Sequence, residues 1–410
     1  MSEGRSRTTE VLYVWPYLEW GGVQIYFAGI MKLARERYAV RAVMPNGSAE
    51  RLLSYMKRLD VPCEFFDAHL DASPALSVWH KVRRRWRKAR CEFVIARHLS
   101  RHPLKRSILH MDFGPWSSFW LLLYLSLRSN VLVTLHIALP VLSGVRGFEW
   151  RLKFRALCSL KGFHLLASNR EMLESLRAYV PPRFMKTVRV AYSGIDQDEI
   201  KQALAADFNR DALCEKYGLP RDRFLVFSLG QMVERKGYRV LLEAARRFKQ
   251  RDARQAPYFV WVGTATRNPS IEDSIDEQGL RDSFRVITSG EIGQSRHDLL
   301  MLLRLADLFA LPSLSEGLPV SLVEMMALGK ACVASNINAI PEAIKDHQTG
   351  VLVAAGDAAG LACAISELQS DAALRERLAA AGQAYALANF DERIAARTTL
   401  DYYDACCQAV

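Results

Sequence analysis

The sequence predicts an α/β protein made of two doubly wound domains, each a parallel β-sheet covered by helices on both faces. Its 410 residues exceed what one hydrophobic core usually supports. Short, continuously apolar runs alternate with helical segments, which is typical of parallel strands buried on both faces. This alternation occurs twice, and a segment rich in charged and turn residues separates the two series. We expect a first domain over residues 1–195, a second over 196–385, and a C-terminal helix over 386–410 that can pack back on the first domain.

The strands of both domains are expected at apolar, β-rich runs. In the first domain they are residues 11–15, 40–44, 107–111, 131–136, 164–168 and 187–192. In the second they are residues 224–230, 258–263, 284–290, 308–313, 331–335 and 350–353. In open sheets of this type, ligands bind beyond the carboxyl ends of the strands. With two such domains facing each other, the expected site is the cleft between them.

Composition restricts the class of protein. Half of the residues are hydrophobic, and the eight cysteines are scattered, without CxxC pairs or companion histidines at metal spacing. This pattern favours reduced thiols in a cytosolic protein over zinc sites or disulfides. The first residues lack the features of a signal peptide. The longest apolar run, residues 119–127, is shorter than the roughly 20 residues that span a bilayer, and we expect it to be a buried helix that begins at Pro115.

Two glutamates follow the expected strand at residues 308–313. Glu316 lies in a loop and Glu324 in the helix predicted from Pro319 to the C-terminal Gly329. The backbone from Gly317 through Leu318 and Pro319 to residue 320 would form the N-terminus of that helix, which favours an anion. A phosphate there, between two carboxylates that accept hydroxyl groups, would suit a sugar joined to a nucleotide by a diphosphate. Two surface glutamates without a ligand are the alternative.

A pair of cations follows the first strand of the second domain. The strand at residues 224–230 ends at Gly230, and Arg235 and Lys236 come just before an amphipathic helix. A lysine there can meet a diphosphate from the side opposite the Glu316 loop. The alternative is a solvated Arg-Lys pair. Because this loop and the Glu316 loop are expected at the same edge of the sheet, the two predictions of a diphosphate site reinforce each other.

These motifs, in this order and spacing, resemble the donor domain of the retaining glycosyltransferases of family 4, the group 1 enzymes with the two-domain, Rossmann-like GT-B fold. The resemblance covers "GQMVERKGYRVLLEA", "FVWVGTA", "ADLFALPSLSEGLPVSLVEMMALGKACVAS" and "GVLV". It is weaker in the first half, at "WGGVQIYFAGIMKLA", "VLVTLHI" and "VAYSGID", where Ser193 replaces an asparagine. The resemblance implies transfer of a sugar from a nucleotide-diphosphate sugar to a saccharide or lipid-linked acceptor, with retention of configuration, in bacterial cell-surface polysaccharide or glycolipid synthesis.

The resemblance also implies roles for single residues. Glu316 would bind hydroxyls of the donor sugar, Glu324 the ribose, and Lys236 the diphosphate. Gly22 would let the first-domain backbone approach the donor phosphates or the acceptor. His136 would line the sugar pocket, as a shaping group more than as a base.

One position departs from the family pattern. The family usually has arginine after the glycine of the first donor-domain strand, and here that residue is Gln231, which removes a positive charge unless Arg235 compensates. Gln231 therefore motivates the alternative of a degenerate transferase that serves as a scaffold at a membrane. A sugar-nucleotide 2-epimerase of the same architecture, which could share diphosphate binding at a helix N-terminus, is the other alternative. No Asp-x-Asp-like pair follows a strand, so we expect cations and helix N–H groups, with no metal or other cofactor, to stabilise the leaving diphosphate.

The positive charge is concentrated in one segment. Residues 81–106 contain eleven Lys and Arg against the single acid Glu92, whereas the whole chain has a net charge of +11. Apolar residues at steps of three and four define one stripe on a helix whose remaining surface is basic. The stripe comprises Trp79, Val82, Trp86, Ala89, Phe93 and Ala96. We expect its C-terminal half to cover the first sheet.

Tryptophans beside basic residues are typical of helices that lie on an anionic bilayer. The residues expected at the membrane surface are Trp79, Arg83, Arg84, Trp86, Arg87 and Lys88. We therefore predict a cytoplasmic enzyme that is peripheral on the inner face of the cell membrane. Nucleic acid is a rival partner for such a cluster, but the sequence has no recognised RNA- or DNA-binding module, so we expect no nucleic acid.

Overall fold

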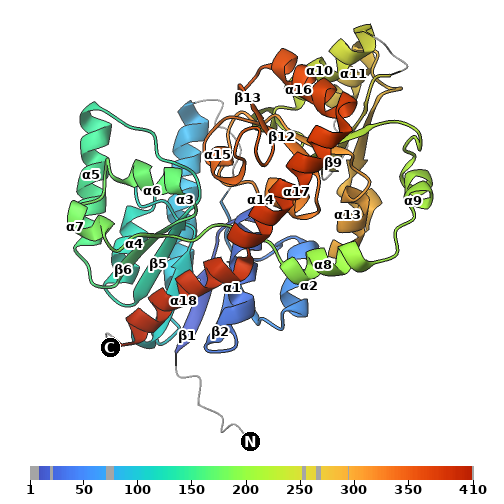
Figure 1. The fold of residues 1–410 in the computed structure, drawn as a ribbon. Coiled ribbons are helices and arrows are strands. Elements are labelled where there is room, and N and C mark those ends of the chain that lie inside the picture. The colour runs from blue at the N-terminus through green and yellow to red at the C-terminus, as the bar shows by residue number, and fades with distance from the viewer. Residues whose placement is uncertain are drawn as a thin grey trace, which may run out of the picture. The chain divides into compact units, whose positions relative to one another are not determined.

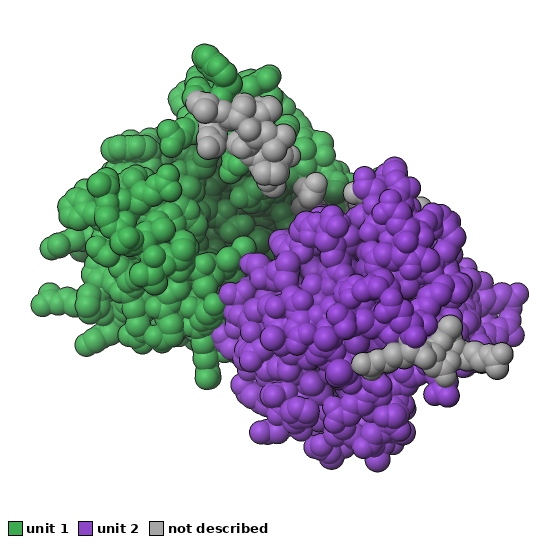
Figure 2. All heavy atoms as spheres, turned by 90° about the horizontal axis from the view of Figure 1, so that it is seen from above, with its two compact units in different colours: residues 1–193, 392–410 green, residues 194–391 purple. Residues whose placement is uncertain are grey.

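A computed structural model describes residues 9–18, 22–70, 78–251, 255–264, 269–293 and 295–408. The chain divides into two compact units, which Figure 2 colours separately. Unit 1 comprises Met1–Ser193 together with Glu392–Val410, and unit 2 comprises Gly194–Asp391. The segment after unit 2 therefore returns to unit 1.

Unit 1 is built on a parallel sheet in the strand order β3-β2-β1-β4-β5-β6-β7 (Figure 1). Its strands are β1 (Glu10–Val14), β2 (Ala39–Pro45), β3 (Cys63–Phe66), β4 (Ser107–Met111), β5 (Asn130–Leu135), β6 (Phe163–Ala167) and β7 (Arg189–Val190). Successive side chains of a strand point to opposite faces, and apolar clusters bury both faces of this sheet. Continuous apolar runs are therefore what these central strands require.

Helices cover the two faces of this sheet. They are α1 (Gly22–Ala34), α2 (Glu50–Arg58), α3 (Val78–Leu99), α4 (Phe119–Ser126), α5 (Gly144–Cys158), α6 (Arg170–Leu176), α7 (Pro182–Met185) and α18 (Glu392–Gln408), with a 3₁₀ turn, η1, at Leu104–Arg106. Residues of α1, α2 and α18 share one apolar cluster, and residues of α3, α4, α5 and α6 share the other. In α18, the buried Tyr403 hydroxyl lies 3.0 Å from that of Tyr13 and 2.6 Å from Nδ1 of His110.

Unit 2 has a second parallel sheet, in the order β10-β9-β8-β11-β12-β13. Its strands are β8 (Leu225–Leu229), β9 (Tyr258–Thr264), β10 (Phe284–Thr288), β11 (Leu308–Leu311), β12 (Ala331–Ser335) and β13 (Val351–Val353). Its helices are α8 (Gln197–Ala205), α9 (Arg210–Tyr217), α10 (Tyr238–Arg251), α11 (Pro269–Glu277), α12 (Ser289–Ile292), α13 (Arg296–Leu303), α14 (Val320–Ala327), α15 (Ile340–Ala343), α16 (Ala358–Ser370) and α17 (Ala372–Asn389), with a 3₁₀ turn, η2, at Glu234–Lys236.

The prediction of two doubly wound parallel-sheet domains is confirmed, and several details differ. Strand β3 was not predicted. The apolar helix expected from Pro115 begins instead at Phe119, because Gly114 to Ser118 form a turn in which Ser117 and Ser118 donate to the Gly114 carbonyl. That helix is only partly buried, since 75% of Trp120 is exposed. Among the described residues, no helix combines the length and hydrophobicity needed to span a membrane.

Candidate active site

The loops that follow β8 and β11 meet at the carboxyl end of the unit 2 sheet. Nζ of Lys236 lies 2.5 Å from Oε1 of Glu316, and the N–H of Leu314 donates to the Arg235 carbonyl at 2.7 Å. Gly237 allows this approach, because it has a φ of +72° and a Cβ there would lie 1.8 Å from the Pro312 carbonyl oxygen. The two loops that the sequence singled out are thus brought together by backbone and side-chain bonds.

Glu316 is held from several sides, although it lies in a loop. It is 8% exposed, the Ser313 hydroxyl donates to Oε1 at 2.8 Å, and its own N–H donates to Oδ1 of Asn338 at 3.2 Å. The Arg235 guanidinium lies 3.6 Å from Oε2, and its side chain is 56% exposed. The carboxylate is therefore fixed in orientation, while Arg235 keeps most of its surface for another anion.

The segment between β8 and α10 contains the other residues predicted to bind the diphosphate. Gly230 has a φ of +137° and its carbonyl accepts from Nε1 of Trp261 at 2.8 Å. A Cβ on Gly230 would lie 3.4 Å from Cε of Lys236, so the glycine leaves room for the lysine stem. Gln231 is exposed. Lys236 lies in the 3₁₀ turn η2, one residue before Gly237.

Helix α14 starts at Val320 with Pro319 as its N-cap. Gly317 is partly exposed, and Leu318 and Pro319 are buried. Because a proline has no N–H, the free donors of this helix end come from the residues after it. The helix terminus predicted at the Glu316 loop is therefore present.

Glu324 has a partner that the sequence analysis did not identify. It is 3% exposed and is hydrogen-bonded by Arg296 at the start of α13, and Arg296 in turn lies 3.3 Å from Glu199 of α8. Burial alone would lower the pKa of Arg296, but the two carboxylates raise it well above its usual value. The predicted ribose-binding carboxylate is therefore already ion-paired, and a hydroxyl group would have to share it with Arg296.

The predicted residues of unit 1 lie at the ends of two of its elements. His136 directly follows β5, its ring meets that of Tyr26 edge-on at 5.1 Å, and burial lowers its pKa to about 4. Its Nε2 has no hydrogen-bond partner within the described part of the chain. Gly22 is exposed at the start of α1, and a Cβ there would meet nothing within 4 Å. His136 is thus a neutral imidazole at neutral pH, and its Nε2 is without a partner among the described residues, which suits the shaping role expected for it.

Asp112 is a candidate that the sequence analysis missed. It directly follows β4, next to the strand that precedes His136, and burial raises its pKa to about 7. A carboxyl group that titrates near neutrality at the carboxyl end of a sheet is a candidate for proton transfer. The signal was available in the sequence, because an acid follows the apolar run "SILHM" immediately.

The basic helix exposes most of the residues predicted at a membrane. Trp79 is 84% exposed, Trp86 68% and Val82 54%. The arginines between and beside them are exposed as well, at positions Arg83, Arg84 and Arg87. Lys88 differs, because it bonds to Glu92 at 2.9 Å and to Ser118 at 3.1 Å. We call Trp79, Val82, Arg83, Arg84, Trp86 and Arg87 the α3 surface.

The predicted apolar stripe of this helix does not cover the sheet in the way expected. Its C-terminal half buries Cys91, Ile95 and Leu99, whereas Phe93 is 67% exposed. Residues spaced by four share one helix face, and this set lies on a different face from the stripe that runs through Trp86 and Phe93. The prediction is therefore wrong for Phe93, whereas Ala96 is partly buried and packs against the core cluster as expected.

Comparison with known proteins identifies the unit that carries the paired loops. Residues 209–385 match the family model described as "Glycosyl transferases group 1". Residues 209–385 are a group 1 glycosyltransferase domain. The predicted resemblance to this family is thereby confirmed, and Lys236, Glu316 and Glu324 all lie within the glycosyltransferase domain.

Relatives of known activity match about half of the chain. "Alpha-D-kanosaminyltransferase" of Streptomyces kanamyceticus is 32% identical over 191 residues, 47% of this chain and 47% of the relative. "Lipopolysaccharide core biosynthesis glycosyltransferase LpsD" of Rhizobium meliloti is 32% identical over 186 residues, 45% of this chain and 50% of the relative. The chain thus spans about half the length of the curated relatives that it matches.

Solved structures resemble the whole chain in fold. Anabaena Alr3699/HepE, determined in complex with UDP and glucose, has a TM-score of 0.73 at 17% identity, over 97% of this chain and 99% of that one. WaaG, a glycosyltransferase involved in lipopolysaccharide biosynthesis, has a TM-score of 0.70 at 16% identity, over 95% and 98%. Unit 1 and unit 2 together therefore have the GT-B fold, and at this identity the likeness extends to the fold alone.

Proposed function

We propose that this protein transfers a sugar, with retention of configuration, from a nucleotide-diphosphate sugar to a saccharide or lipid-linked acceptor in cell-surface polysaccharide or glycolipid synthesis. The observation that supports this most directly is the pairing of Lys236 with Glu316 beside the N-terminus of α14. This arrangement joins a cation and free helix N–H groups, which suit a diphosphate, to a fixed carboxylate, which suits sugar hydroxyls. The lipopolysaccharide relative named above supports cell-surface glycan synthesis as the setting.

The proposed mechanism centres on the leaving group. Transfer develops negative charge on the departing diphosphate, and preorganised cations and N–H dipoles stabilise that charge. Lys236, Arg235 and the N-terminus of α14 would supply this stabilisation in place of a metal ion. In the structure Lys236 bonds to Glu316, so a bound diphosphate would share that ammonium group. Arg235, with a side chain 56% exposed, would add the charge that Gln231 does not provide.

The other residues would orient the substrates. Glu316 would accept hydrogen bonds from hydroxyls of the donor sugar, and Glu324 would accept one from the ribose beside Arg296. From unit 1, Gly22 would let the backbone approach the phosphates or the acceptor. His136, kept neutral by burial, would shape the sugar pocket without acting as a base.

Donor binding tests this proposal. A panel of nucleoside diphosphates and their sugars should raise the melting temperature of the wild-type protein, since a ligand that binds the native state stabilises it. Lys236→Met should weaken diphosphate binding roughly 10- to 100-fold, the loss expected for one charge-assisted hydrogen bond. Lys216→Met, an exposed lysine of the same unit, is the matched control. Failure of every nucleotide to shift the melt would contradict the proposal and favour a scaffold.

Product analysis separates the transferase from an epimerase of the same fold. Incubation with the stabilising donor and a mixed pool of acceptors should release nucleoside diphosphate and form a glycoside. Recovery of an epimerised donor without transfer would instead establish the epimerase. The same assay with Glu316→Gln should show loss of turnover.

We also propose that the α3 surface holds the protein on an anionic membrane, where a lipid-linked acceptor would be found. Two tryptophans, 84% and 68% exposed, lie beside three exposed arginines, a combination suited to the boundary between lipid headgroups and acyl chains. Near an anionic surface each basic residue contributes about 1 kcal/mol. Three arginines would therefore strengthen binding about 100-fold, and the tryptophans would add an apolar contribution.

Co-sedimentation with vesicles tests this location. Wild-type protein should sediment with anionic vesicles and much less with neutral ones, and salt should weaken the binding. Replacing Arg83, Arg84 and Arg87 with serine should weaken it about 100-fold. Replacing both tryptophans with alanine should weaken it as well, because the apolar contribution is lost. The control replaces three exposed residues of unit 2, Lys201, Lys216 and Arg377, with serine. It removes the same net charge as the α3 triple variant and should have little effect on vesicle binding. Equal losses in both triple variants would assign binding to net charge and overturn the proposal.

A further inference from the structure

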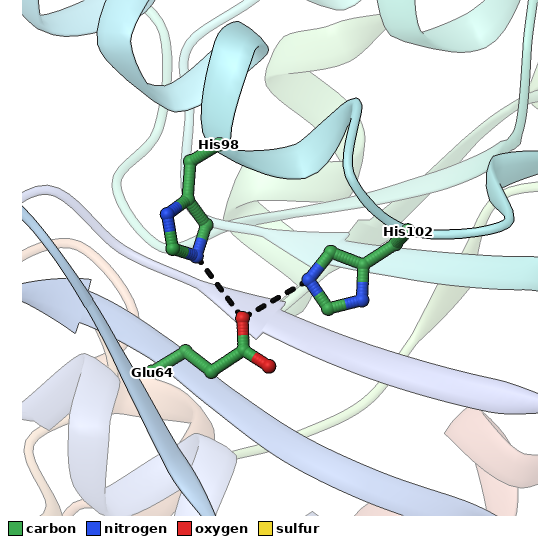
Figure 3. A group of neighbouring side chains, drawn as sticks. All are labelled: Glu64, His98 and His102. Atoms are coloured by element: carbon green, nitrogen blue, oxygen red, sulfur yellow. Dashed lines mark hydrogen bonds and ion pairs between the residues drawn. The ribbon is translucent and has the colours of Figure 1, made fainter.

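Two histidines and a glutamate converge at the amino ends of the first strands of unit 1. His98 lies in the last turn of α3, His102 in the turn that follows, and Glu64 in the edge strand β3. Figure 3 shows the three side chains pointing toward one another, from the helix on one side and the sheet on the other. Oε2 of Glu64 lies 3.0 Å from Nε2 of His98 and 3.0 Å from Nε2 of His102.

The second ring nitrogen of His102 and the second oxygen of Glu64 have partners of their own. Nδ1 of His102 lies 3.1 Å from Oε2 of Glu10 at the start of β1. Arg41 of β2 lies 3.0 Å from Oε1 of Glu64 and 3.2 Å from Oε1 of Glu10. The guanidinium thus binds Oε1 of both carboxylates, and Oε2 of Glu64 faces the two imidazoles.

We propose that Glu64, His98 and His102 bind a divalent cation of the zinc class. Their ligand atoms lie within 4.8 Å of one another, and they form the single such group among the described residues. Around a tetrahedral zinc, with ligand distances of about 2.1 Å, neighbouring ligand atoms are separated by roughly 3.4 Å. Two of the separations here are 3.0 Å, so small side-chain movements would admit the ion.

The surroundings match those of a zinc ligand set. A histidine that binds metal through one ring nitrogen usually donates its other N–H to a carboxylate, which fixes the ring and its tautomer. His102 has this arrangement, with Nε2 toward Glu64 and Nδ1 toward Glu10. Two imidazoles and one carboxylate favour zinc and its neighbours over magnesium or calcium, which take oxygen ligands. The side chains of both histidines are 12% exposed and that of Glu64 is 27% exposed, so the ion could enter past the carboxylate.

The bound ion would clamp the edge of the sheet. It would join the last turn of α3 to β3, an edge strand that pairs only with β2 in the described sheet. Zinc binds a ring nitrogen that carries no proton, so protons would compete with the ion and binding would weaken as the pH falls. Within unit 1 the site lies at the amino ends of the strands, whereas Asp112 and His136 follow carboxyl ends, and its test does not depend on the proposed transferase activity.

Zinc binding by the full-length protein tests the proposal. Protein stripped with a chelator and dialysed against zinc chloride should retain one zinc ion per chain and melt at a higher temperature. His98→Gln, which can still bond to Glu64, and Glu64→Gln should each lose the ion and the shift. Glu10→Gln should keep the site but weaken it roughly 10- to 100-fold, as loss of an outer carboxylate does. Circular dichroism in the presence of chelator checks that each variant folds.

Two controls make the outcome decisive. Cys406 lies 3.4 Å from Nε2 of His164 and is a competing zinc ligand, so Cys406→Ser should bind zinc as the wild type does. His347→Gln removes an exposed histidine of unit 2 and should also bind normally. Absence of zinc from the wild type, or retention of zinc by both His98→Gln and Glu64→Gln, would overturn the proposal. Loss in Cys406→Ser alone would place the ion on the cysteine and overturn it as well.

Discussion

The ammonium group of Lys236 and the carboxylate of Glu316 form an ion pair at 2.5 Å, although 80 residues separate them in the chain. Their side chains are 13% and 6% exposed, so the pair is largely removed from water. The ion pair therefore contributes to the stability of the fold, besides any role in binding a donor. Experiments on either residue have to measure folding stability and donor binding separately.

Lys236→Met should lower the free energy of unfolding by roughly 2 to 4 kcal/mol, because it leaves the buried Glu316 carboxylate with only the more distant, exposed Arg235 as a cation. The double variant Lys236→Met with Glu316→Gln should regain part of that loss, since no unpaired charge remains. Urea unfolding of the wild type, both single variants and the double variant gives the coupling energy directly. Strictly additive effects would show that the two side chains are energetically independent.

Arg296→Gln should destabilise unit 2 by roughly 2 to 4 kcal/mol, because Glu324 is 3% exposed and loses its cation. Glu199→Gln is the matched comparison. It removes the other partner of Arg296, and its side chain is 29% exposed, so its effect should stay below about 1 kcal/mol. Denaturant melts of the two variants should rank in this order, and the reverse ranking would contradict the assignment of Arg296 to Glu324.

Gly237→Ala should break the contact between the loop that follows β8 and the loop that follows β11. The residue has a φ of +72°, and the added Cβ would overlap the Pro312 carbonyl oxygen. Gly356→Ala is its control, because the φ is +79° but a Cβ there meets nothing within 4 Å. The control should cost about 1 to 2 kcal/mol for the left-handed backbone alone, and Gly237→Ala clearly more. Equal losses in thermal melts would mean that the close approach at Pro312 is unimportant.

Asp112 should make stability depend on pH between about 4 and 7. Burial raises its pKa to about 7, so in this range the folded state keeps a proton that the unfolded state has lost. The contribution of Asp112 to stability therefore falls as the pH rises, by up to about 1.4 kcal/mol per pH unit, whereas that of His136, whose pKa burial lowers to about 4, rises. Asp112→Asn should make stability rise more steeply with pH than in the wild type, by up to about 1.4 kcal/mol per pH unit, whereas Asp273→Asn, at an exposed position, should leave the profile unchanged. Unfolding curves at several pH values provide the measurement.

The sequence predicted the strands best where they are buried on both faces. Residues 107–111 and 331–335 coincide with β4 and β12, because a central parallel strand needs an uninterrupted apolar run. Strand β3 was missed because an edge strand has only one neighbour and tolerates polar residues. Its Cys63 and Glu64 are partly exposed and Phe65 is 40% exposed.

The candidate sites were predictable to the extent that their residues follow strands. Glu316 and Lys236 could be associated because the carboxyl ends of parallel strands share one edge of a sheet. The partner of Glu324 could not be found in this way, because Arg296 comes from the start of a helix. The four-residue spacing of His98 and His102 was readable, but as metal ligands the histidines were considered only as companions of cysteine. Glu64 belongs to the strand that was not predicted.

The contact between Tyr403 of α18 and Tyr13 of β1 has a consequence for biosynthesis. Residues 392–408 emerge from the ribosome only after all of unit 2 has been made, yet they cover α1 and bond to His110 and Tyr13 inside unit 1. Unit 2 can thus finish folding during translation, while unit 1 waits with an apolar face uncovered. Ribosome-arrested chains that stop before residue 392 should bind chaperones through unit 1, and chains that extend past α18 should release them.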